Sequence, residues 1–521
     1  MKREDLLKKI SDTSKTWDVI VIGGGATGLG IAVDAATRGY QVALLEGEDF
    51  AKATSSRSTK LVHGGVRYLA QGDIALVLEA LHERGLLKQN APHLVKNLSF
   101  LIPNYRYWDN FLYTIGLTLY DVLAGRLSFG RSKYLSKQKT LHKLQTLQEK
   151  GLKGGVLYHD GQFDDSRLAI HLAQSSVDQG GCPINHIKVT NLLHAPDGTI
   201  CGVKAQDQLS GNIYQIRAKA VINATGIFVD SIMQMDIPGH EEVVRPSQGI
   251  HLVLDKSFLP GHCAMMIPKT EDGRVLFAVP WHDKVVVGTT DTLREQASLE
   301  PQALDAEIEF VLNTAGKYLI RQPRRSDVLS VFAGLRPLAA PQKEGKNTKE
   351  ISRSHKILVS PNRLVTIIGG KWTTYRRMAE DTLDKAIELQ LLEKKPCVTR
   401  NLHLHGYLAH PDFSNPLYIY GSDASQIESW IKGNPVLSKK LHARYTYTVA
   451  EVIWAVREEM ARTVEDVLAR RVRLLFLDAR AAIEIAPQVA RIIARELGHD
   501  QNWINRQINE FTELAQNYLL A

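Results

Sequence analysis

The chain has 521 residues, of which 44% are hydrophobic and 23% are charged, so it can bury a large core and should fold as two or three domains. Its four cysteines include no Cys-x-x-Cys pair, which argues against a disulfide framework, a zinc site or an iron–sulfur cluster. A net charge of +8 is compatible with an anionic substrate, an anionic membrane surface or nucleic acid.

The first 17 residues are polar and lack the apolar stretch of a secretory signal. No apolar run approaches the roughly 18 residues that a membrane-spanning helix needs. We therefore expect the protein to stay in the cytoplasm.

A strand–helix–strand unit follows this polar stretch. Residues 19–22 form an apolar β run, residues 26–38 have the pattern of an Ala-rich helix, and residues 41–45 form a second strand. Gly39 is typical of a helix end. Helical patterns dominate residues 72–151, with an aromatic loop predicted at residues 93–110.

The pattern changes twice in the rest of the chain. Short β runs separated by turn residues predict a sheet-rich region over residues 152–337. A strand at residues 363–370 then leads into a long helix at about residues 373–391, which repeats the opening strand–turn–helix order. Residues 401–521 contain several helices and should form a separate helical domain.

The glycine turn after the first strand carries the clearest chemical signature. Gly23, Gly25 and Gly28 have the G-x-G-x-x-G spacing of a dinucleotide site, in which a pyrophosphate approaches the bare backbone and the following helix N-terminus. Glu46, at the end of the second strand, is placed to accept hydrogen bonds from an adenosine ribose. The turn at residues 222–226, sequence INATG, is typical of a second contact on FAD but is weak evidence alone.

Three further stretches, residues 54–69, 332–338 and 369–380, resemble the family of flavin-dependent glycerol-3-phosphate dehydrogenases. With the opening motif and residues 280–291, the resemblance covers about residues 17–380, and the helical C-terminal region also resembles that family. It implies oxidation of sn-glycerol 3-phosphate to dihydroxyacetone phosphate on FAD, with electrons passed to a membrane quinone. The implied fold class is α/β, with a Rossmann-like FAD-binding domain, a β-sheet-rich substrate domain of the D-amino-acid-oxidase type and a C-terminal helical domain.

The resemblance also divides the chain. It assigns residues 17–400 to the FAD-dependent core and residues 401–521 to the helical domain. Within the core, FAD-binding segments at about 17–75, 152–235 and 350–395 alternate with substrate-domain segments at about 76–151 and 236–349.

A phosphate dianion beside a flavin needs several fixed cations, and bidentate arginine binds it best. Arg67, Arg336 and Lys371 each lie beside glycines inside a matching motif, although any one of them could equally make a solvated ion pair. We expect them to bind substrate, together with Tyr68 and Thr290.

The hydroxyl proton must leave as hydride departs, and histidine has a suitable pKa for this role. His63 is therefore the predicted base, although it could instead orient the flavin. Arg336 could stabilise the developing alkoxide, and Lys371 could stabilise the reduced flavin. These three form the predicted catalytic set.

The predicted cofactor contacts fall into three groups. The motif itself gives Gly23, Gly25, Ala26, Thr27, Gly28 and Glu46. By resemblance the flavin and its ribityl chain contact Ser55, Ser56, Thr59, Lys60, His63 and Gly226. The second glycine pair and the helix after it give Gly370, Lys371, Trp372 and Thr373. Gln248 stands where a family lysine is expected, which leaves His251 as a candidate in that motif.

Partners follow mainly from the resemblance. We expect glycerol 3-phosphate, a quinone pool and peripheral contact with the cytoplasmic membrane, with no nucleic-acid partner, and a homo-oligomer is compatible with the sequence. Lipid contact could come from the apolar residues 110–125 or from the arginine-rich residues 467–480, although ion pairing in the core is the stronger interpretation for those arginines.

Three rival functions stay open. An oxygen-reducing glycerol-3-phosphate oxidase would share the same site. A flavin-dependent amine or 2-hydroxy acid oxidase would bind a carboxylate with the same arginines. A flavin-binding protein without turnover would show no reaction at all.

Overall fold

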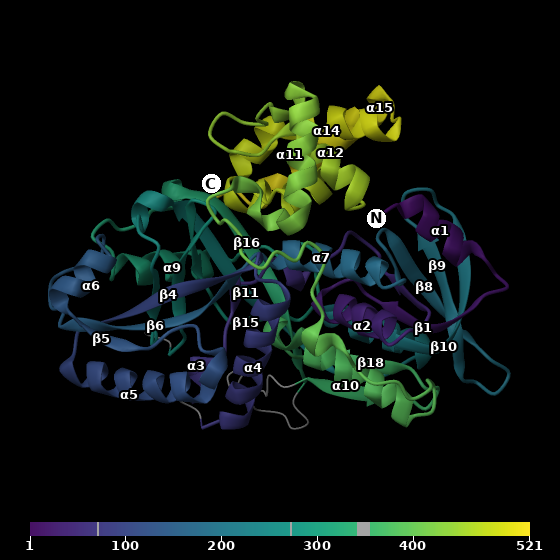
Figure 1. The fold of residues 1–521 in the computed structure, drawn as a ribbon, viewed down its shortest axis with the longest axis horizontal. Coiled ribbons are helices and arrows are strands. Elements are labelled where there is room, and N and C mark those ends of the chain that lie inside the picture. The colour runs from purple at the N-terminus through teal and green to yellow at the C-terminus, as the bar shows by residue number, and fades with distance from the viewer. Residues whose placement is uncertain (70–71, 271–272, 341–354, 521) are drawn as a thin grey trace.

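The computed structural model of the protein describes residues 1–69, 72–270, 273–340 and 355–520. The backbone but not the side chain is described for five residues: Arg67, Tyr107, Asp109, Asn110 and Leu112. Two sheets lie side by side beneath a cap of helices (Figure 1).

The first sheet has the predicted dinucleotide-binding arrangement. Its neighbours run in the order β17-β18-β10-β1-β2-β7, and the pairs from β18 to β7 are parallel. The hairpin β8–β9 extends it beyond β10. The strands are β1 Thr16–Ile22, β2 Val42–Leu45, β7 Cys182–Ile184, β8 Ile187–His194, β9 Ile200–Asp207, β10 Ile213–Asn223, β17 Lys356–Val359 and β18 Val365–Ile368.

Three helices pack together against this sheet. Helix α2 (Ala26–Thr37) follows β1 and lies between α7 (Asp165–Asp178) and α10 (Tyr375–Glu388). Helix α10 begins within two residues of its predicted start, which returns the late chain to the first sheet. Helix α7 lies in a region predicted to be sheet. Its residues 165–176 are all buried, polar and charged side chains included, so its polar residues do not mark a solvent-facing side as they do in an amphipathic surface helix.

The second sheet is mixed, with the order β15-β11-β14-β13-β12-β4-β6-β3, and β16 and β5 pair with β11 and β6. Its strands are β3 Leu61–Val62, β4 Val95–Asn104, β5 Lys133–Ser136, β6 Gly154–Phe163, β11 Val244–Asp255, β12 Ala264–Ile267, β13 Leu276–Trp281, β14 Lys284–Gly288, β15 Thr292–Leu293 and β16 Val328–Ala339. Strands β3 and β6 belong to this sheet, although the family resemblance assigned their residues to FAD-binding segments.

The predicted aromatic loop at residues 93–110 is wrong, because most of it is strand β4. Phe100 and Ile102 pack on one side of the sheet and Leu101 packs on the other. Burial of both faces removes the alternation by which a strand is recognised. Three helices cover this sheet, with α4 and α5 along its lower side in Figure 1: α4 Ile74–Asn90, α5 Tyr107–Ala124 and α9 Asp305–Gly316.

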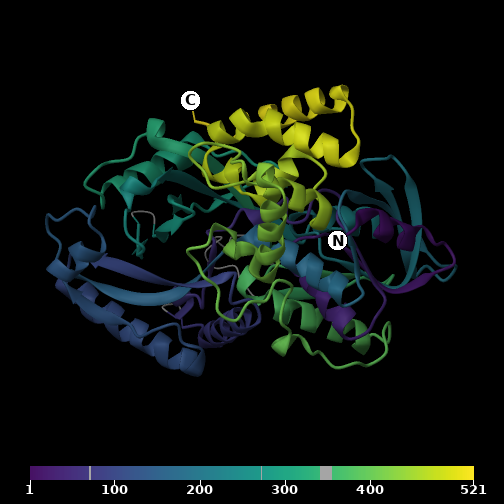
Figure 2. The ribbon, with the colours of Figure 1, turned by 45° about the horizontal axis from the view of Figure 1, so that its top comes forward.

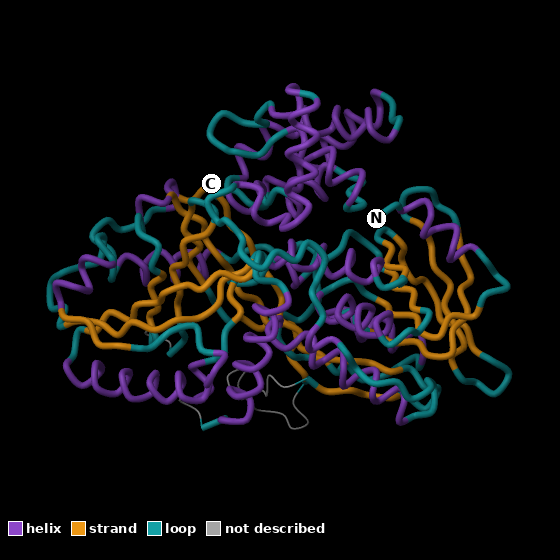
Figure 3. Tube along the Cα trace, in the orientation of Figure 1, coloured by secondary structure: helices purple, strands orange, loops and turns teal. Residues whose placement is uncertain are grey.

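The C-terminal helices form the cap that is yellow in Figures 1 and 2 and purple in Figure 3. Most of them share one apolar core, into which Trp281 and Phe332 of the second sheet also pack. Residues 424–433 instead join a smaller cluster that includes Ala450 and Trp454. The cap therefore docks directly on the core. Its main elements are α11 Ala424–Gly433, α12 Val449–Glu458, the π-helix η11 Asp466–Arg471, α13 Leu474–Leu477, α14 Ala479–Leu497 and α15 Gln501–Gln516.

Candidate active site

Two cavities meet between the sheets. The larger, about 530 Å³, begins at the turn between β1 and α2. The smaller, about 310 Å³, lies against the second sheet. Residues of both walls include Thr54, Gly370, Lys371 and Trp372. An elongated ligand bound at the β1–α2 turn can therefore extend into the smaller cavity.

The glycines at the β1–α2 turn are required by close backbone contacts. Gly23 has φ +104°, and a Cβ atom there would lie 2.8 Å from the carbonyl oxygen of Ala224. A Cβ atom on Gly28 would lie 1.9 Å from the carbonyl oxygen of Gly23. Gly23, Gly25, Ala26 and Thr27 line the larger cavity, whereas Gly28 seats the helix on the turn. The N-terminus of α2 thus faces the cavity, as an anionic pyrophosphate requires.

Glu46 lies at the end of β2 and also lines the larger cavity. Its carboxylate accepts hydrogen bonds from the backbone N–H groups of Gly24, at 2.6 Å, and Glu48, at 2.8 Å. Burial raises the pKa of this carboxyl. These two bonds fix the side chain beside the turn, in the position that a ribose acceptor needs.

The chain therefore fits FAD on its own geometry. A glycine turn leaves room for a pyrophosphate, a helix N-terminus faces it, and a fixed carboxylate stands at the ribose end. The adjoining cavity, where Trp372 donates from Nε1 to the carbonyl oxygen of Ser55 at 2.8 Å, can take the flavin ring. Gly226 also lines the larger cavity.

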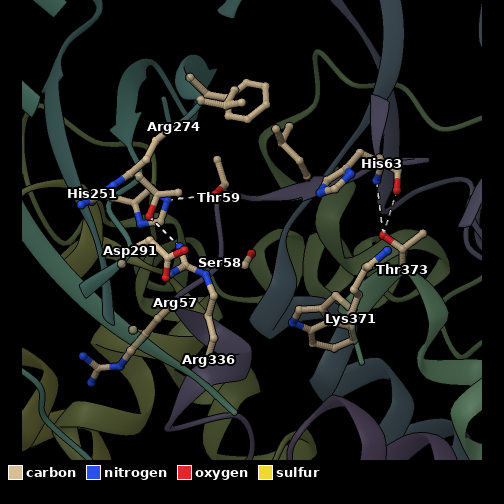
Figure 4. Close-up of a pocket in the computed structure, with 18 of the residues that line it drawn as sticks. Arg57, Ser58, Thr59, His63, His251, Arg274, Asp291, Arg336, Lys371 and Thr373 are labelled. Atoms are coloured by element: carbon tan, nitrogen blue, oxygen red, sulfur yellow. Dashed lines mark hydrogen bonds and ion pairs between the residues drawn. The ribbon is translucent and has the colours of Figure 1, made fainter. Parts of the chain in front are cut away.

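Arg336 lies on β16 of the second sheet, and it lines the smaller cavity. Its Nη2 donates to Thr289 Oγ1 at 2.9 Å, and Nη1 lies 3.7 Å from Asp291 Oδ1. A Cβ atom on Gly249 would lie 2.2 Å from Nη2. The guanidinium therefore occupies space that only a glycine leaves open, and it is held on the cavity wall (Figure 4).

His63 and Lys371 approach the same cavity from the other side (Figure 4). The backbone N–H of His63 donates to Thr373 Oγ1 at 3.3 Å. The ammonium of Lys371 lies 4.1 Å from the centre of the Tyr68 ring, which is a cation–π contact. One cavity is thus lined by five of the predicted residues: His63, Tyr68, Arg336, Lys371 and Thr373.

His251, on β11, is a second imidazole in this cavity. It stacks on Phe332 with ring centres 4.9 Å apart, and its Nε2 lies 2.9 Å from Thr59 Oγ1. Burial and the cations Lys60 and Arg336 hold its pKa well below the usual value. His251 is therefore neutral at neutral pH, and the same burial and nearby cations make it a weak proton acceptor.

Some predicted residues lie elsewhere. Lys60 is buried behind the loop, where Nζ contacts Asp165 Oδ2 and the Ser56 carbonyl oxygen, both at 2.7 Å, and burial lowers its pKa to about 7. Neither Ser56 nor Lys60 is among the described residues of the two cavity walls. Thr290 lines the smaller cavity, but its hydroxyl donates to Glu307 Oε1 at 2.7 Å. The side chain of Arg67 lies outside the described part of the chain.

Two arginines on the wall of the smaller cavity were not predicted from the sequence: Arg57 and Arg274. Arg57 pairs with Glu300 at 2.7 Å and donates to the carbonyl oxygen of Ala333 at 3.1 Å. Arg57 sits inside the predicted stretch of residues 54–69, so that motif already contained it. Arg274 follows Gly273 and carries no distinguishing pattern in the sequence.

Comparison with known proteins agrees with this geometry. Residues 18–369 match the family model described as FAD dependent oxidoreductase, and residues 363–503 match the C-terminal domain of alpha-glycerophosphate oxidase. The chain is 38% identical to the probable mitochondrial glycerol-3-phosphate dehydrogenase of Caenorhabditis elegans and to the mitochondrial glycerol-3-phosphate dehydrogenase of Rattus norvegicus, over 99% of this chain and 75% of each relative.

A solved structure has the same architecture throughout. The glycerol-3-phosphate dehydrogenase from Bacillus halodurans, complexed with FAD, superposes with a TM-score of 0.80 at 29% identity, covering 99% of this chain and 97% of that one. The match includes the helical cap as well as both sheets. The chain therefore belongs to the family of FAD-dependent glycerol-3-phosphate dehydrogenases, and it is a flavin oxidoreductase.

Proposed function

We propose that this protein oxidises sn-glycerol 3-phosphate at C2 to dihydroxyacetone phosphate and passes the electrons to a membrane quinone. FAD, when bound, supplies the hydride acceptor. The observation that carries the proposal is that Arg336, Lys371 and two histidines line a single cavity that opens into the FAD-binding cavity.

The cations on the cavity wall suit a phosphate dianion. Arg336 is held by Thr289 and Asp291, so little side-chain freedom is lost when it binds an anion. Lys371 adds a second positive charge and lies against Tyr68. A carboxylate substrate would bring one negative charge to the same cations, so we expect weaker binding of 2-hydroxy acids.

A base must take the hydroxyl proton of the substrate. His63 lines the cavity beside Lys371, and its backbone is tied to Thr373. His251 is the alternative, since its buried imidazole is neutral. We assign the proton to His63, because burial and the nearby cations hold the pKa of His251 so low that it is a weak base.

Anaerobic mixing of the flavoprotein with glycerol 3-phosphate tests the reaction directly. We expect loss of flavin absorbance with glycerol 3-phosphate and little change with lactate or glycine at equal concentration. Bleaching by the carboxylates alone would favour an amine or 2-hydroxy acid oxidase, and an unchanged spectrum with every substrate would favour a flavin-binding protein without turnover. Peroxide yield in air, compared with quinone reduction, separates the oxidase from the dehydrogenase.

We also propose that helix α5 lies on the membrane surface. Its outer face carries apolar side chains at helical spacing: Trp108, Phe111, Ile115, Leu119 and Val122, whose exposed fractions are 82%, 64%, 53%, 46% and 69%. The exposed residues Arg106, Arg126 and Arg131 lie near the helix ends. An apolar face flanked by basic residues is typical of an interfacial helix. Among the described residues, no helix is both long and apolar enough to cross a bilayer.

Every residue of the arginine-rich segment 467–480 except Arg480 is buried. Arg470, Arg471 and Arg473 are 2%, 1% and 1% exposed and form ion pairs inside the protein. The buried ion pairs support the core-pairing interpretation of Arg470, Arg471 and Arg473, and the proposed lipid contact rests on α5.

A further inference from the structure

The loop of residues 46–60, here called the cofactor loop, has two faces. One face lines both cavities through residues such as Glu46, Ser55 and Thr59. The other face contacts the C-terminal cap. The loop contains only one short 3₁₀ turn, Thr54–Ser56, so contacts from outside must determine much of its shape.

The first such contact is at Asp49, which is fully buried. Arg471 binds its carboxylate with two bonds, Nη1 to Oδ2 at 2.8 Å and Nη2 to Oδ1 at 3.0 Å. Arg470 adds a bond from Nε to Oδ2 at 2.6 Å and donates from Nη2 to Asp466 at 2.8 Å. His186 also lies against Asp466, and these two residues with Asp49 are close enough to share a cation. The Arg470 guanidinium already supplies that positive charge.

The second contact is at Ser56. Arg473 donates from Nη2 to the Ser56 carbonyl oxygen at 2.9 Å and to Asp165 Oδ1 at 3.0 Å. Asp165 in turn accepts from the Ser58 hydroxyl and from Lys60, both at 2.7 Å. Arg473 has φ +63°, a conformation that is unfavourable for a residue with a side chain and persists where surrounding contacts enforce it. The cap thus holds the loop at both ends.

Between these ends, Lys52 of the loop lies 3.1 Å from Glu465 of the cap. Lys52 also lines the larger cavity. Buried charges of this kind are costly unless every partner stays in place. Movement of the cap away from the core would leave the charge of Asp49 unpaired and would leave Asp165 with Lys60 as its cationic partner, so the loop would have to rearrange.

We propose that the C-terminal cap positions the cofactor loop, through Arg471 and Arg473, in the shape that binds FAD. FAD binding and docking of residues 466–477 are then thermodynamically coupled, each favouring the other. The inference depends on FAD binding and not on which substrate is oxidised.

The first test compares two buried arginines at the same interface. Arg473→Met keeps the side-chain volume and removes the bonds to Ser56 and Asp165. Arg462→Met removes a pair between the cap and Glu4 of the core, and the described side-chain bonds of Arg462 go to Glu4 and to the carbonyl oxygens of Val456 and Ala461, not to the cofactor loop or to Arg471. FAD affinity of each apoprotein is measured by titration, with apoprotein melting temperature measured in parallel. Couplings between sites typically change affinity about 5- to 150-fold.

We expect Arg473→Met to weaken FAD binding by on the order of tenfold and Arg462→Met to leave it within about twofold while lowering the melting temperature. Arg473→Lys should restore part of the affinity, since lysine can still reach one acceptor. Equal FAD affinity in the Arg473→Met variant and the unmodified protein would overturn the proposal, as would equal losses in both methionine variants.

The second test needs no variant. Hydrogen exchange of the unmodified chain is compared with and without FAD. We expect FAD to slow exchange at residues 466–477, none of which is among the described residues of either cavity wall, and to leave residues 501–516 of α15 unchanged. Unchanged exchange at residues 466–477, or uniform slowing across the whole cap, would contradict a specific link between the cap and the cofactor loop.

Discussion

The hydroxyl of Tyr120 accepts a hydrogen bond from the backbone N–H of Gly64 at 2.8 Å and donates to Asp160 Oδ2 at 2.8 Å. Tyr120 lies on the inner side of α5, and Gly64 follows His63 in the predicted substrate loop. Arg84 fixes the same carboxylate at 2.6 Å. The helix with the exposed apolar face is therefore bonded directly to the loop that carries the proposed base.

Replacing Tyr120 by phenylalanine should displace this loop without opening a cavity. The Gly64 N–H would lose its buried acceptor, which typically costs about 1 to 3 kcal/mol. We expect the displacement of the loop that carries His63 to slow flavin reduction by glycerol 3-phosphate by about tenfold. The control is Tyr134→Phe, since Tyr134 is 49% exposed. A lower melting temperature with unchanged reduction kinetics would show that Tyr120 serves stability alone.

Arg336→Ala should weaken the use of glycerol 3-phosphate and leave FAD bound. Losing one partner of a desolvated charge-assisted contact typically costs about 2 to 5 kcal/mol, which should appear in kcat/KM. Arg336→Lys should recover only part of this loss, because an ammonium cannot make the bidentate contact. The flavin spectrum reports cofactor loading, and an unaltered kcat/KM in the alanine variant would remove Arg336 from the substrate site.

His63→Ala and His251→Ala should separate the base from its neighbour. General-base catalysis typically contributes about 10² to 10⁴ in rate, so we expect the reductive half-reaction of His63→Ala to slow by that order. His251→Ala should retain more activity than His63→Ala. The contacts of His251 to Thr59 and Phe332 give it a role in shaping the cavity wall, and in our proposal it does not take the proton. Stopped-flow reduction under anaerobic conditions measures both, and the reverse order of effects would assign the proton to His251.

The sequence predicted the parts of the site that depend on local backbone geometry. The turn at Gly23, Gly25 and Gly28 was predictable because a helix and two strands flank it. Arg336 and Lys371 were found through their motifs, and Figure 4 shows them on the wall of one cavity. The sequence did not identify Gly249, the glycine that accommodates Arg336. Gly249 lies on β11 and Arg336 lies on β16, and only the pairing of these two strands brings the residues together.

Residues whose partners are distant in sequence were harder to interpret. Lys60 lies among predicted flavin contacts, but its ammonium turns to Asp165, 105 residues away. Strand β4 was missed because burial on both sides removes the alternation that marks a strand. Helix α7 was also missed, and its polar and charged side chains are buried with the rest. The apolar stretch at residues 110–125 was recognised, yet only the structure separates the inner Tyr120 from the outer Phe111 and Ile115.

Removing apolar side chains from the outer face of α5 should release the protein from lipid. Burying a phenylalanine or isoleucine side chain contributes about 1.5 to 3 kcal/mol. We expect Phe111→Ser with Ile115→Ser to lower binding to vesicles of mixed anionic and neutral lipid by at least about tenfold in a sedimentation assay. Leu209→Ser with Ile213→Ser, at exposed positions of the β9–β10 hairpin, is the control. Equal binding of both double variants would place the lipid contact elsewhere.

His405 gives a pH-dependent prediction for the docking of the cap. Its ring donates from Nδ1 to Asp178 at 2.7 Å and from Nε2 to Asp423 at 2.9 Å, which joins α7 to the start of α11. Burial alone would lower its pKa, but the two carboxylates raise it to about 9, above the ordinary value of 6.5. The folded protein therefore binds more protons than the unfolded chain between these values, and the contribution to stability is full below about pH 6.5 and lost as the pH rises through about 9.

We expect this contribution to be about 2 kcal/mol, a reduced figure because the Asp178 side chain is 48% exposed and solvent screens the pair. Denaturant unfolding across this pH range, compared with a His405→Gln variant, measures it. The variant should be less stable at about pH 6.5 and should approach the unmodified protein at higher pH. A stability difference that does not change with pH would show that His405 is neutral in the folded protein, and that its two bonds to carboxylates are not charge-assisted.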